Sequence, residues 1–400
     1  MTRNDYIVNS LHNLEQYVRD HHYSGYDPYD ALNSPSLKSF KSKFLKLVVT
    51  QFFVYSPINC RTFFNIEPDK NPKAIGLFLS SYCKLFKSGL INKKDFSDVT
   101  AELVDYLQKK KSKGYSGLCW GYNFAWQDLK RYSEKWLPNI VATSYVGNSF
   151  LDLYEITGEE KYLDFVKSIC NFILKDLNIT TTQEGICFSY TPIDKFVVHN
   201  ANCLGAAFLS RVYSFTQEKK LLEYSTKAFD FSLSFQKNDG SWAYSLDSVT
   251  HKERNQLDYH QGFILDSIIN FITFTRKNDC KYLQSLMKGI EFYITQQFEE
   301  RGCSKWRLPW RFPVDIHNQA QGIITLSKMY EMCKEEKYLD FVKKMTEWTI
   351  EHMQDKKGYF YYQKWSFFTN KISYMRWGQA WMMLALSTLM EIKYGSQIKN

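Results

Sequence analysis

A repeat of about 59 residues runs through most of this chain and limits what it can fold into. The nonapeptide EEKYLDFVK occurs at Glu159–Lys167 and again at Glu335–Lys343, 176 positions later. Between and around these copies, glycines open an apolar segment at intervals of 58, 57, 60 and 56 residues, at Gly147, Gly205, Gly262, Gly322 and Gly378. The two nonapeptides are therefore three periods apart, and they are samples of an array of similar units.

Each unit has the pattern of two helices followed by a long return segment. The segment that begins at each glycine, such as GAAFLSRVY or GQAWMMLALS, is apolar nearly all round, as expected of a helix that is packed on both sides. The segment after it is amphipathic, with Tyr162, Phe165, Val166, Ile169 and Ile173 at helical spacing. The pattern predicts an inner and an outer ring of helices, with short β-hairpin-like return loops on one face.

The number of units predicts an all-α fold, an (α/α)6 toroid with six inner and six outer helices, as a single domain over residues 1–400. NPKAIGLFLSSY supplies the sixth inner helix around Gly76. Ser36–Phe53 is expected to close the ring as the partner of the last inner helix. Residues 1–35 are expected to form an N-terminal helix and a loop that contributes to the central funnel.

Composition and charge exclude several classes of protein. No apolar run approaches 18 residues, so no transmembrane segment is expected, and the N-terminus lacks the apolar core of a signal peptide. Nine cysteines without a C-x-x-C pair are typical of reduced thiols, which predicts a cytoplasmic protein. The net charge of +9 slightly favours an anionic partner. A basic-aromatic stripe is absent, so no nucleic-acid partner is expected.

Polar clusters stand just before each inner-helix glycine, in TSYVG, HNANCLG, LDYHQG, DIHNQAQG and YMRWG. Helix N-termini and loops converge there on one face, which is where a site is expected. Capping by Asp and Asn is the alternative interpretation of single clusters, but five around one axis are harder to explain that way. The predicted substrate-binding residues of these clusters and of the segment GLCWGYNF are Trp120, Tyr122, Asn200, Asn202, Gln261, Asn318, Arg376 and Trp377.

Two Asp-x-His pairs repeat at the local period and are the predicted catalytic residues. Asp258 and His260 precede one inner helix, and Asp315 and His317 precede the next, 57 residues later. We expect the pairs side by side on the funnel rim, where they could share a proton across a substrate or orient a base through a carboxylate–imidazole bond. Tyr374, before the last inner helix, is a further catalytic candidate.

Aromatic residues make up 17% of the chain, and an excess of Tyr and Trp is common in sugar-binding clefts, although packing between helices is the commoner explanation. We expect at least two of five rings to face the funnel and stack on sugar faces: Trp120, Tyr122, Trp242, Trp306 and Trp377.

The stretch YSGYDPYDALNSP, at Tyr23–Pro35, places two aspartates among tyrosines and turn formers. Over Gly25–Ser34 it resembles the opening of the VpsJ-like proteins, a bacterial surface-polysaccharide biosynthesis family of capsule, exopolysaccharide and O-antigen clusters with all-helical toroid folds. The resemblance implies a role in making or trimming a surface glycan, and it makes Asp27 and Asp30 candidate substrate-binding residues. It supplies no mechanism.

Motifs of other toroid enzymes are incomplete. FQKNDGSWAYS resembles a motif of terpene and squalene cyclases, yet no Asp-Asp pair exists for their chemistry. Cys119 and Cys187 occupy similar places in successive return segments, and His199 or His260 could join them, but no close-spaced pair of zinc ligands is present. Both Gly-rich phosphate fingerprints are absent. No metal and no cofactor are therefore expected.

The remaining class is chemistry on an oligosaccharide or polysaccharide. Arg376 would suit an anionic group on such a substrate. Hydrolysis needs two carboxylates across the glycosidic bond, which the aspartates of the two Asp-x-His pairs could supply. A polysaccharide lyase or uronate C5-epimerase needs a His or Tyr base and a cation, roles that the two histidines, Tyr374 and Arg376 fit. The residues overlap, and we prefer a glycoside hydrolase because carboxylates are plentiful. A non-catalytic glycan-binding or scaffold protein is the alternative of another class.

Overall fold

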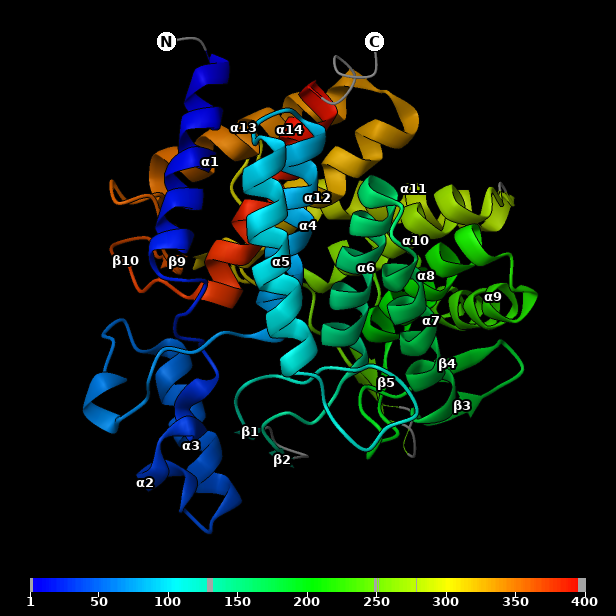
Figure 1. The fold of residues 1–400 in the computed structure, drawn as a ribbon, viewed down its shortest axis with the longest axis horizontal. Coiled ribbons are helices and arrows are strands. Elements are labelled where there is room, and N and C mark those ends of the chain that lie inside the picture. Colours follow the sequence, from blue (N-terminus) through cyan, green and yellow to red (C-terminus); the bar gives the residue numbers. More distant parts are fainter. Residues whose placement is uncertain (1–2, 128–131, 248–249, 251, 278, 395–400) are drawn as a thin grey trace.

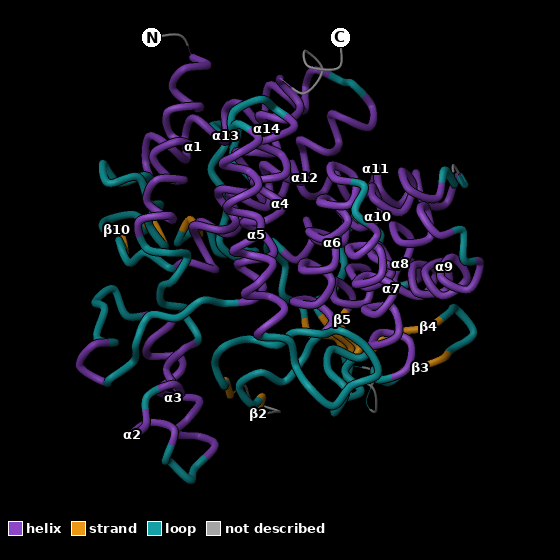
Figure 2. Tube along the Cα trace, in the orientation of Figure 1, coloured by secondary structure: helices purple, strands orange, loops and turns teal. Residues whose placement is uncertain are grey.

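The molecule is described by a computed structural model that covers residues 3–127, 132–247, 250, 252–277 and 279–394. Helices dominate it, and short strands lie at one end of the helical rings (Figure 1, Figure 2). Each inner helix contacts the next one, and the last contacts the first, which closes the ring. The expected all-α toroid is confirmed. The inner helices are α4 (Pro72–Lys87), α6 (Ile140–Thr157), α8 (His199–Thr216), α10 (His260–Thr275), α12 (Ile316–Cys333) and α14 (Ala380–Tyr394), the last preceded by a π-helical turn, η3 (Met375–Gln379).

Six outer helices surround this ring, and each packs against one inner helix. Five of them follow their inner partner in the chain, and the sixth comes from the N-terminus and packs against α14. They are α5 (Lys93–Lys109), α7 (Glu160–Lys175), α9 (Lys219–Ser234), α11 (Cys280–Gln297), α13 (Glu336–Met353) and α1 (Arg3–Asp20).

The helix that closes the outer ring is α1, so the expectation that Ser36–Phe53 does so is wrong. In α1, Ile7, Leu11, Leu14 and Val18 recur at helical spacing and are all buried. The predicted segment instead forms α2 (Pro35–Lys38) and α3 (Lys43–Tyr55), which pack on the 3-10 turn η1 (Asp30–Asn33) and on β1 below the ring (Figure 1). Both segments are apolar on one face, and only tertiary contacts distinguish them.

The glycines that mark the repeat are needed where inner helices meet their neighbours closely. A Cβ on Gly322 would lie 2.4 Å from both Met345 and Phe298, and one on Gly147 would lie 2.4 Å from Phe208. Because real Cβ atoms do not approach other atoms so closely, the period of the glycines records the period of helix packing.

The return segments gather at the end of the toroid where the inner helices begin. In each three-stranded antiparallel sheet, the first strand belongs to one return segment and the other two to the next, so neighbouring segments are tied together. The strands are β1 (Trp126–Gln127) with β2 (Tyr132–Ser133), β3 (Ile179–Thr181) with β4 (Ile186–Phe188), β5 (Val197–Val198) with β6 (Ser245–Leu246) and β7 (Glu253–Arg254), and β8 (Val314–Asp315) with β9 (Gln363–Lys364) and β10 (Thr369–Asn370).

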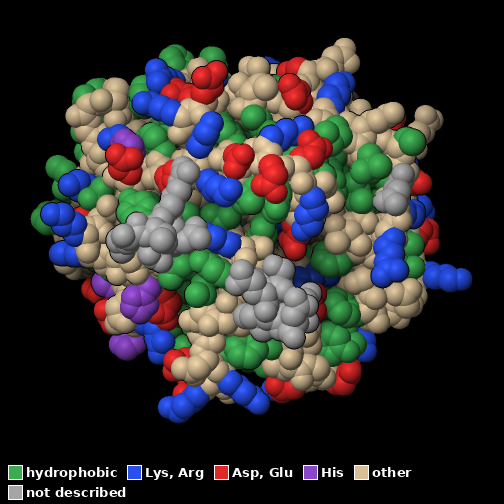
Figure 3. Space-filling view, turned by 90° about the horizontal axis from the view of Figure 1, so that it is seen from above, with side chains coloured by type: hydrophobic (Ala, Val, Ile, Leu, Met, Phe, Trp, Pro, Cys, Tyr) green, Lys and Arg blue, Asp and Glu red, His purple; other side chains and the backbone are tan. Residues whose placement is uncertain are grey.

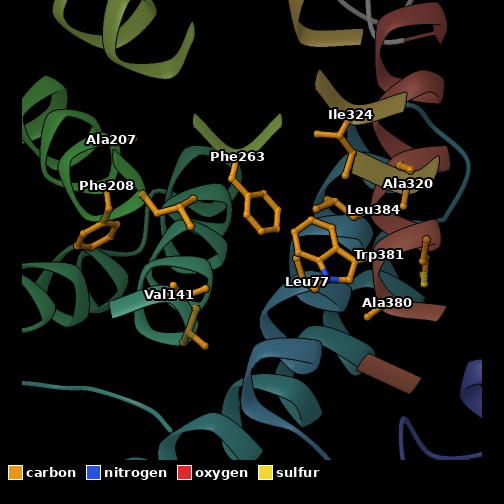
Figure 4. Packing of buried hydrophobic residues seen from close by; sticks show 14 of the residues in the cluster. Leu77, Val141, Ala207, Phe208, Phe263, Ala320, Ile324, Ala380, Trp381 and Leu384 are labelled. Carbon is orange, nitrogen blue, oxygen red and sulfur yellow. The ribbon is translucent and has the colours of Figure 1, made fainter. Parts of the chain in front are cut away.

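Side chains from several inner helices meet along the axis. In Figure 4, the rings of Phe263 and Trp381 face each other across the centre, with Leu77, Val141 and Phe208 around them. At the end where both termini lie, Lys and Arg side chains are interspersed with Asp and Glu (Figure 3). In the part of the chain that the structure covers, no helix is long and apolar enough to cross a membrane.

Candidate active site

A cavity of about 270 Å³ opens among the first turns of the inner helices, the return segments, α3 and the N-terminal loop. Its lining is rich in aromatic and basic groups, and no Asp or Glu is among the described residues that line it. The cavity is therefore a polar aromatic pocket of positive charge, as suits a ligand with hydroxyl and acidic groups. Its aromatic and basic lining residues are Tyr29, Tyr55, Lys73, Tyr122, Phe124, Trp126, Tyr190, Tyr244, Arg254, Tyr259, His260, Phe263, Arg307, His317, Arg376 and Trp377.

Lys73 reaches the cavity from the first turn of α4, above a layer of three aromatic rings. Its Nζ lies 4.8, 4.9 and 5.5 Å from the ring centroids of Tyr145, Trp381 and Phe263. Such cation–π contacts favour the ammonium form. Burial, with the charge of Arg376, nevertheless lowers the pKa of Lys73 well below its usual value. An anion in the cavity would favour the charged form of this lysine.

Asp258 holds the ring of His260. Its Oδ1 lies 2.5 Å from Nδ1 of His260 and also accepts the backbone N–H of that residue at 3.1 Å. Its Oδ2 accepts from Nε2 of Gln256 at 2.8 Å and lies 3.6 Å from Nε of Arg307. Burial raises the pKa of Asp258, but the His260 ring, Arg307 and Gln256 outweigh it, and the pKa is below its usual value. The ionised carboxylate orients the imidazole and leaves Nε2 for a ligand.

Asp315 is arranged differently from Asp258, although the two share a sequence pattern. It caps α12 by accepting the backbone N–H of His317 at 2.9 Å, and it accepts from Nε2 of Gln363 at 2.8 Å and Nε1 of Trp377 at 3.0 Å. Burial raises the pKa of Asp315 to about 6, against the effect of these hydrogen bonds. The capping interpretation of this aspartate is therefore correct, and no bond to the His317 ring forms.

His317 is positioned by ring packing. Its ring stacks on Tyr259 at 4.3 Å and lies 4.6 Å from Trp377, and neither ring nitrogen has a hydrogen-bond partner among the described residues. Burial, followed by the charges of Lys73 and Arg376, lowers the pKa of His317 well below its usual value. The ring is thus neutral at pH 7 and borders the cavity, and both of its nitrogens are buried and unpaired in the described chain.

The aspartates of the N-terminal loop are held by arginines. Arg376 donates from Nε and Nη2 to the two oxygens of Asp27 at 2.6 and 2.8 Å. Arg61 donates to Oδ1 of Asp30 at 2.7 Å and to the hydroxyl of Tyr374 at 3.0 Å. Arg376 lines the cavity, whereas Asp27, Asp30 and Tyr374 lie behind its wall. The structure therefore joins the loop to η3, the turn before the last inner helix, and does not present Asp27, Asp30 or Tyr374 to the cavity.

Besides Asp27 and Asp30, four predicted substrate-binding residues do not line the cavity: Trp120, Asn202, Gln261 and Asn318. Asn202 and Gln261 accept backbone N–H groups of their return segments, at Phe188 and Trp242. The same bond recurs in the other repeats, where the backbone N–H groups of Trp120, Ser304 and Phe360 donate to the side chains of Thr143, Gln319 and Gln379. It is therefore a structural feature of every full repeat. Asn318 accepts from the Tyr259 backbone, and the Trp120 indole donates to the Leu107 carbonyl inside the core.

Tyr122 and Trp377 line the cavity, although Trp377 is only 7% exposed, whereas Trp120 and Trp242 are fully buried. Trp306 lies beside Tyr55 and does not line the cavity. Asn200 does, and its Oδ1 has no hydrogen-bond partner in the described chain.

Sequence reasoning missed Lys73, Arg254, Arg307 and Tyr259. The signal for Lys73 was present, because it is a charged residue in the first turn of the otherwise apolar segment NPKAIGLFLSSY. The return segments are rich in tyrosine and arginine throughout, so Tyr259 and the two arginines had no such signal. Among the described residues, no group of three or more His, Cys, Asp or Glu is arranged to hold a metal ion.

The family model of glycosyl hydrolase family 76 matches residues 142–306, which is less than half of the chain. A comparison with curated proteins gives no match. Among solved structures, a cellobiose 2-epimerase from Bacillus thermoamylovorans is similar at a TM-score of 0.63 and 14% identity, over 81% of this chain and 88% of that one.

A glycoside hydrolase family 76 mannosidase from Bacteroides thetaiotaomicron is similar at a TM-score of 0.63 and 14% identity, over 86% of this chain and 92% of that one. The Lin0763 protein from Listeria innocua is similar at a TM-score of 0.65 and 15% identity, over 98% of both chains. At these identities the likeness shows a shared toroid fold.

Proposed function

We propose that this protein is an enzyme that acts on a sugar or glycan, with His260 and His317 as its proton-transfer groups. The observation that carries this proposal is that both rings border one cavity and contact the same side chain, Tyr259, at centroid distances of 4.1 and 4.3 Å. Asp258 binds Nδ1 of His260 and orients its ring, whereas burial keeps the ring of His317 neutral. The two rings are suited to act as an acid and base pair, with His317 as the proton acceptor and His260 as the donor.

This arrangement favours proton transfer at a carbon of the sugar, as in an epimerase or a lyase. His317 removes a proton next to a carbonyl or carboxyl group, and His260 returns one on the other face or protonates the leaving group. The two aspartates are engaged through all four oxygens, by Gln256, His260, Gln363 and Trp377 among others. Their role in this mechanism is to position the neighbouring groups.

Hydrolysis is the second candidate reaction, and the match of the glycosyl hydrolase family 76 model to residues 142–306 favours it. A pair of catalytic carboxylates must reach the glycosidic bond. Asp315, with a pKa of about 6, has the protonation behaviour of a general acid, but it would first have to release Gln363 or Trp377.

We further infer that the substrate carries an acidic group. Lys73 has no carboxylate partner among the described residues, and Arg254 adds positive charge to the same lining. Arg376 and Arg307, by contrast, are paired with Asp27 and Asp258. A uronate carboxylate or a phosphate near Lys73 would also raise the pKa of His317 and so strengthen it as a base.

A role in surface-polysaccharide biosynthesis in the cytoplasm is part of the proposal. It is supported by the resemblance over Gly25–Ser34, whose aspartates anchor the loop that walls the cavity, and by nine cysteines that are all free. Free thiols are usual in a reducing compartment.

The experiment is a product analysis in deuterium oxide with a panel of mono- and oligosaccharides, with and without uronate or phosphate groups. Solvent deuterium on carbon without cleavage identifies an epimerase, ultraviolet absorbance of an unsaturated uronate a lyase, and new reducing ends a hydrolase. His260→Gln and His317→Gln should each lower turnover roughly 100-fold or more at an unchanged melting temperature. His352→Gln, on outer helix α13, is the matched control and should have no effect. Full turnover in either cavity variant, or binding without turnover in the unmodified protein, would contradict the proposal.

A further inference from the structure

Apolar side chains are exposed together on α3 and on the turn that follows it. Phe44, Ile58 and Phe63 expose 71%, 70% and 84% of their surface. Six such residues define what we call the α3–η2 patch, where η2 is the 3-10 turn Thr62–Phe64: Phe44, Leu45, Val48, Phe52, Ile58 and Phe63. On α3, Phe44, Val48 and Phe52 are spaced four residues apart and therefore share one face of the helix. An exposed apolar cluster of this kind marks an interaction surface.

The segment that carries the patch has charge of one sign. Between Ala31 and Ile66 the sequence contains no Asp or Glu, and it contains four lysines and one arginine. The arginine, Arg61, is buried and paired with Asp30, but the lysines are on the surface or partly so: Lys38, Lys41, Lys43 and Lys46. This differs from the opposite end of the molecule, where both signs of charge are mixed (Figure 3).

We propose that the α3–η2 patch docks the protein on a membrane surface that contains anionic lipids. A short amphipathic helix with aromatic residues on its apolar face and lysines around it has the chemistry of an interfacial helix. The region lies apart from the helical rings, below them in Figure 1, so a flat surface can reach it. A second copy of this chain fits less well, because a two-fold contact through the patch would bring eight lysines together without an acidic partner from this segment.

The helix that carries most of the patch, α3, also borders the cavity. Thr50, Gln51, Val54 and Tyr55, on α3, line the cavity, and Tyr55 is itself 46% exposed. Docking through α3 therefore brings the cavity close to the lipid headgroups. A sugar attached to a lipid could enter it without leaving the membrane surface. This consequence depends on the proposed function, whereas the docking itself does not.

Sedimentation of the full chain with lipid vesicles tests the docking. We expect the protein to sediment with vesicles of phosphatidylcholine containing one-third phosphatidylglycerol, and far less with phosphatidylcholine alone. Each lysine near an anionic surface contributes about fivefold to binding. Replacement of all four by Gln should therefore reduce binding by roughly 100-fold or more. The triple variant Phe44→Ser, Phe52→Ser, Phe63→Ser should lose binding to both vesicle types.

Controls place similar changes away from the patch. The apolar control changes two exposed residues, Leu90→Ser in the loop between α4 and α5 and Met287→Ser on α11. The charge control replaces four exposed lysines of outer helices by Gln: Lys94, Lys167, Lys227 and Lys343. Both controls should bind vesicles as the unmodified chain does.

Three outcomes would overturn the proposal. The first is the absence of sedimentation with phosphatidylglycerol vesicles, and the second is an equal loss in patch and control variants. The third is a dimer in solution that the triple Phe→Ser variant dissociates, because the patch would then bind a second copy. Turnover of a soluble sugar is measured in parallel. Docking without turnover would contradict the proposed function alone, and turnover without docking would contradict this inference alone.

Discussion

Arg376 and Asp27 form a two-point ion pair that joins segments 349 residues apart, with N–O distances of 2.6 and 2.8 Å. Both residues are at least 95% buried. The pair fixes the N-terminal loop against η3 and so sets one wall of the cavity. Loss of either partner should therefore destabilise the fold.

Asp27→Ala should lower the free energy of unfolding by about 3 to 5 kcal/mol, because it leaves a buried guanidinium without a partner. Arg376→Met combined with Asp27→Ala should cost less than the sum of the two single changes, since no unpaired charge then remains. Chemical denaturation of the four proteins measures the cycle. Additive losses would mean that the two charges do not interact as described.

Gln319→Ala should lower the free energy of unfolding by about 2 to 3 kcal/mol, because it leaves buried groups unsatisfied. The side chain of Gln319 accepts the N–H of Ser304 at 2.6 Å and donates to Thr349 at 2.7 Å. Gln296→Ala, on an exposed face of α11, is the matched control and should change stability by less than about 0.5 kcal/mol. Equal losses in the two variants would contradict a special role for the first-turn glutamines.

Asp258→Asn should lower kcat roughly 100-fold or more and change KM little, because it removes the carboxylate that binds Nδ1 and orients the His260 ring. Steady-state kinetics on the substrate found in the product analysis measures both constants. Asp340→Asn, on the solvent face of α13, should leave them unchanged. A large rise in KM at constant kcat would instead make Asp258 a binding residue.

Lys73→Met should raise KM for sugars with an acidic group by roughly 10- to 100-fold and leave neutral sugars unaffected, because the cavity loses its unpaired cation. Its melting temperature should not fall, since a buried charge without a partner is costly to the folded state. Thermal denaturation and inhibition by uronates and neutral sugars test both parts. An equal loss of affinity for both kinds of sugar would remove the acidic group from the proposal.

His199→Phe should make the protein less sensitive to acid. His199 is fully buried against Phe231 and Phe235, and burial lowers its pKa to about 4. The unfolded chain therefore binds more protons between about pH 6.5 and 4, so the stabilising effect of a neutral His199 is present above pH 6.5 and is lost as the pH falls.

Between pH 7 and 4.5 this loss amounts to about 2 to 3 kcal/mol, and the variant should lack it. Urea unfolding of both proteins at the two pH values provides the measurement, because all other titrating groups contribute equally to both. The same pH dependence in both proteins would mean that His199 is protonated in the fold.

The sequence by itself determined the repeating architecture. Helical periodicity and the spacing of the marker glycines depend on contacts within a unit and with its neighbours. At Gly147, Gly205, Gly262 and Gly322 an added Cβ would lie within 2.6 Å of a neighbouring side chain, whereas at Gly378 the contact is an ordinary 3.4 Å. Three features follow from that regularity. They are the number of rings, the end at which the return segments gather, and the placement of both Asp-x-His pairs near one axis.

Only the tertiary structure decided which of two apolar N-terminal helices closes the ring, because α1 and α3 both have an apolar face and differ in what each can reach. It also decided how similar motifs diverge. Asp258 bonds to the His260 ring while Asp315 bonds to the backbone of His317, and this difference depends on Gln363 and Trp377, which come from distant return segments. Gln261 and Asn318 serve the fold because a backbone N–H group, of Trp242 and of Tyr259, lies close enough to bind each side chain. Such distances between segments are not encoded in the local sequence. Lys73 becomes a cavity residue because rings from α6, α10 and α14 meet beneath it.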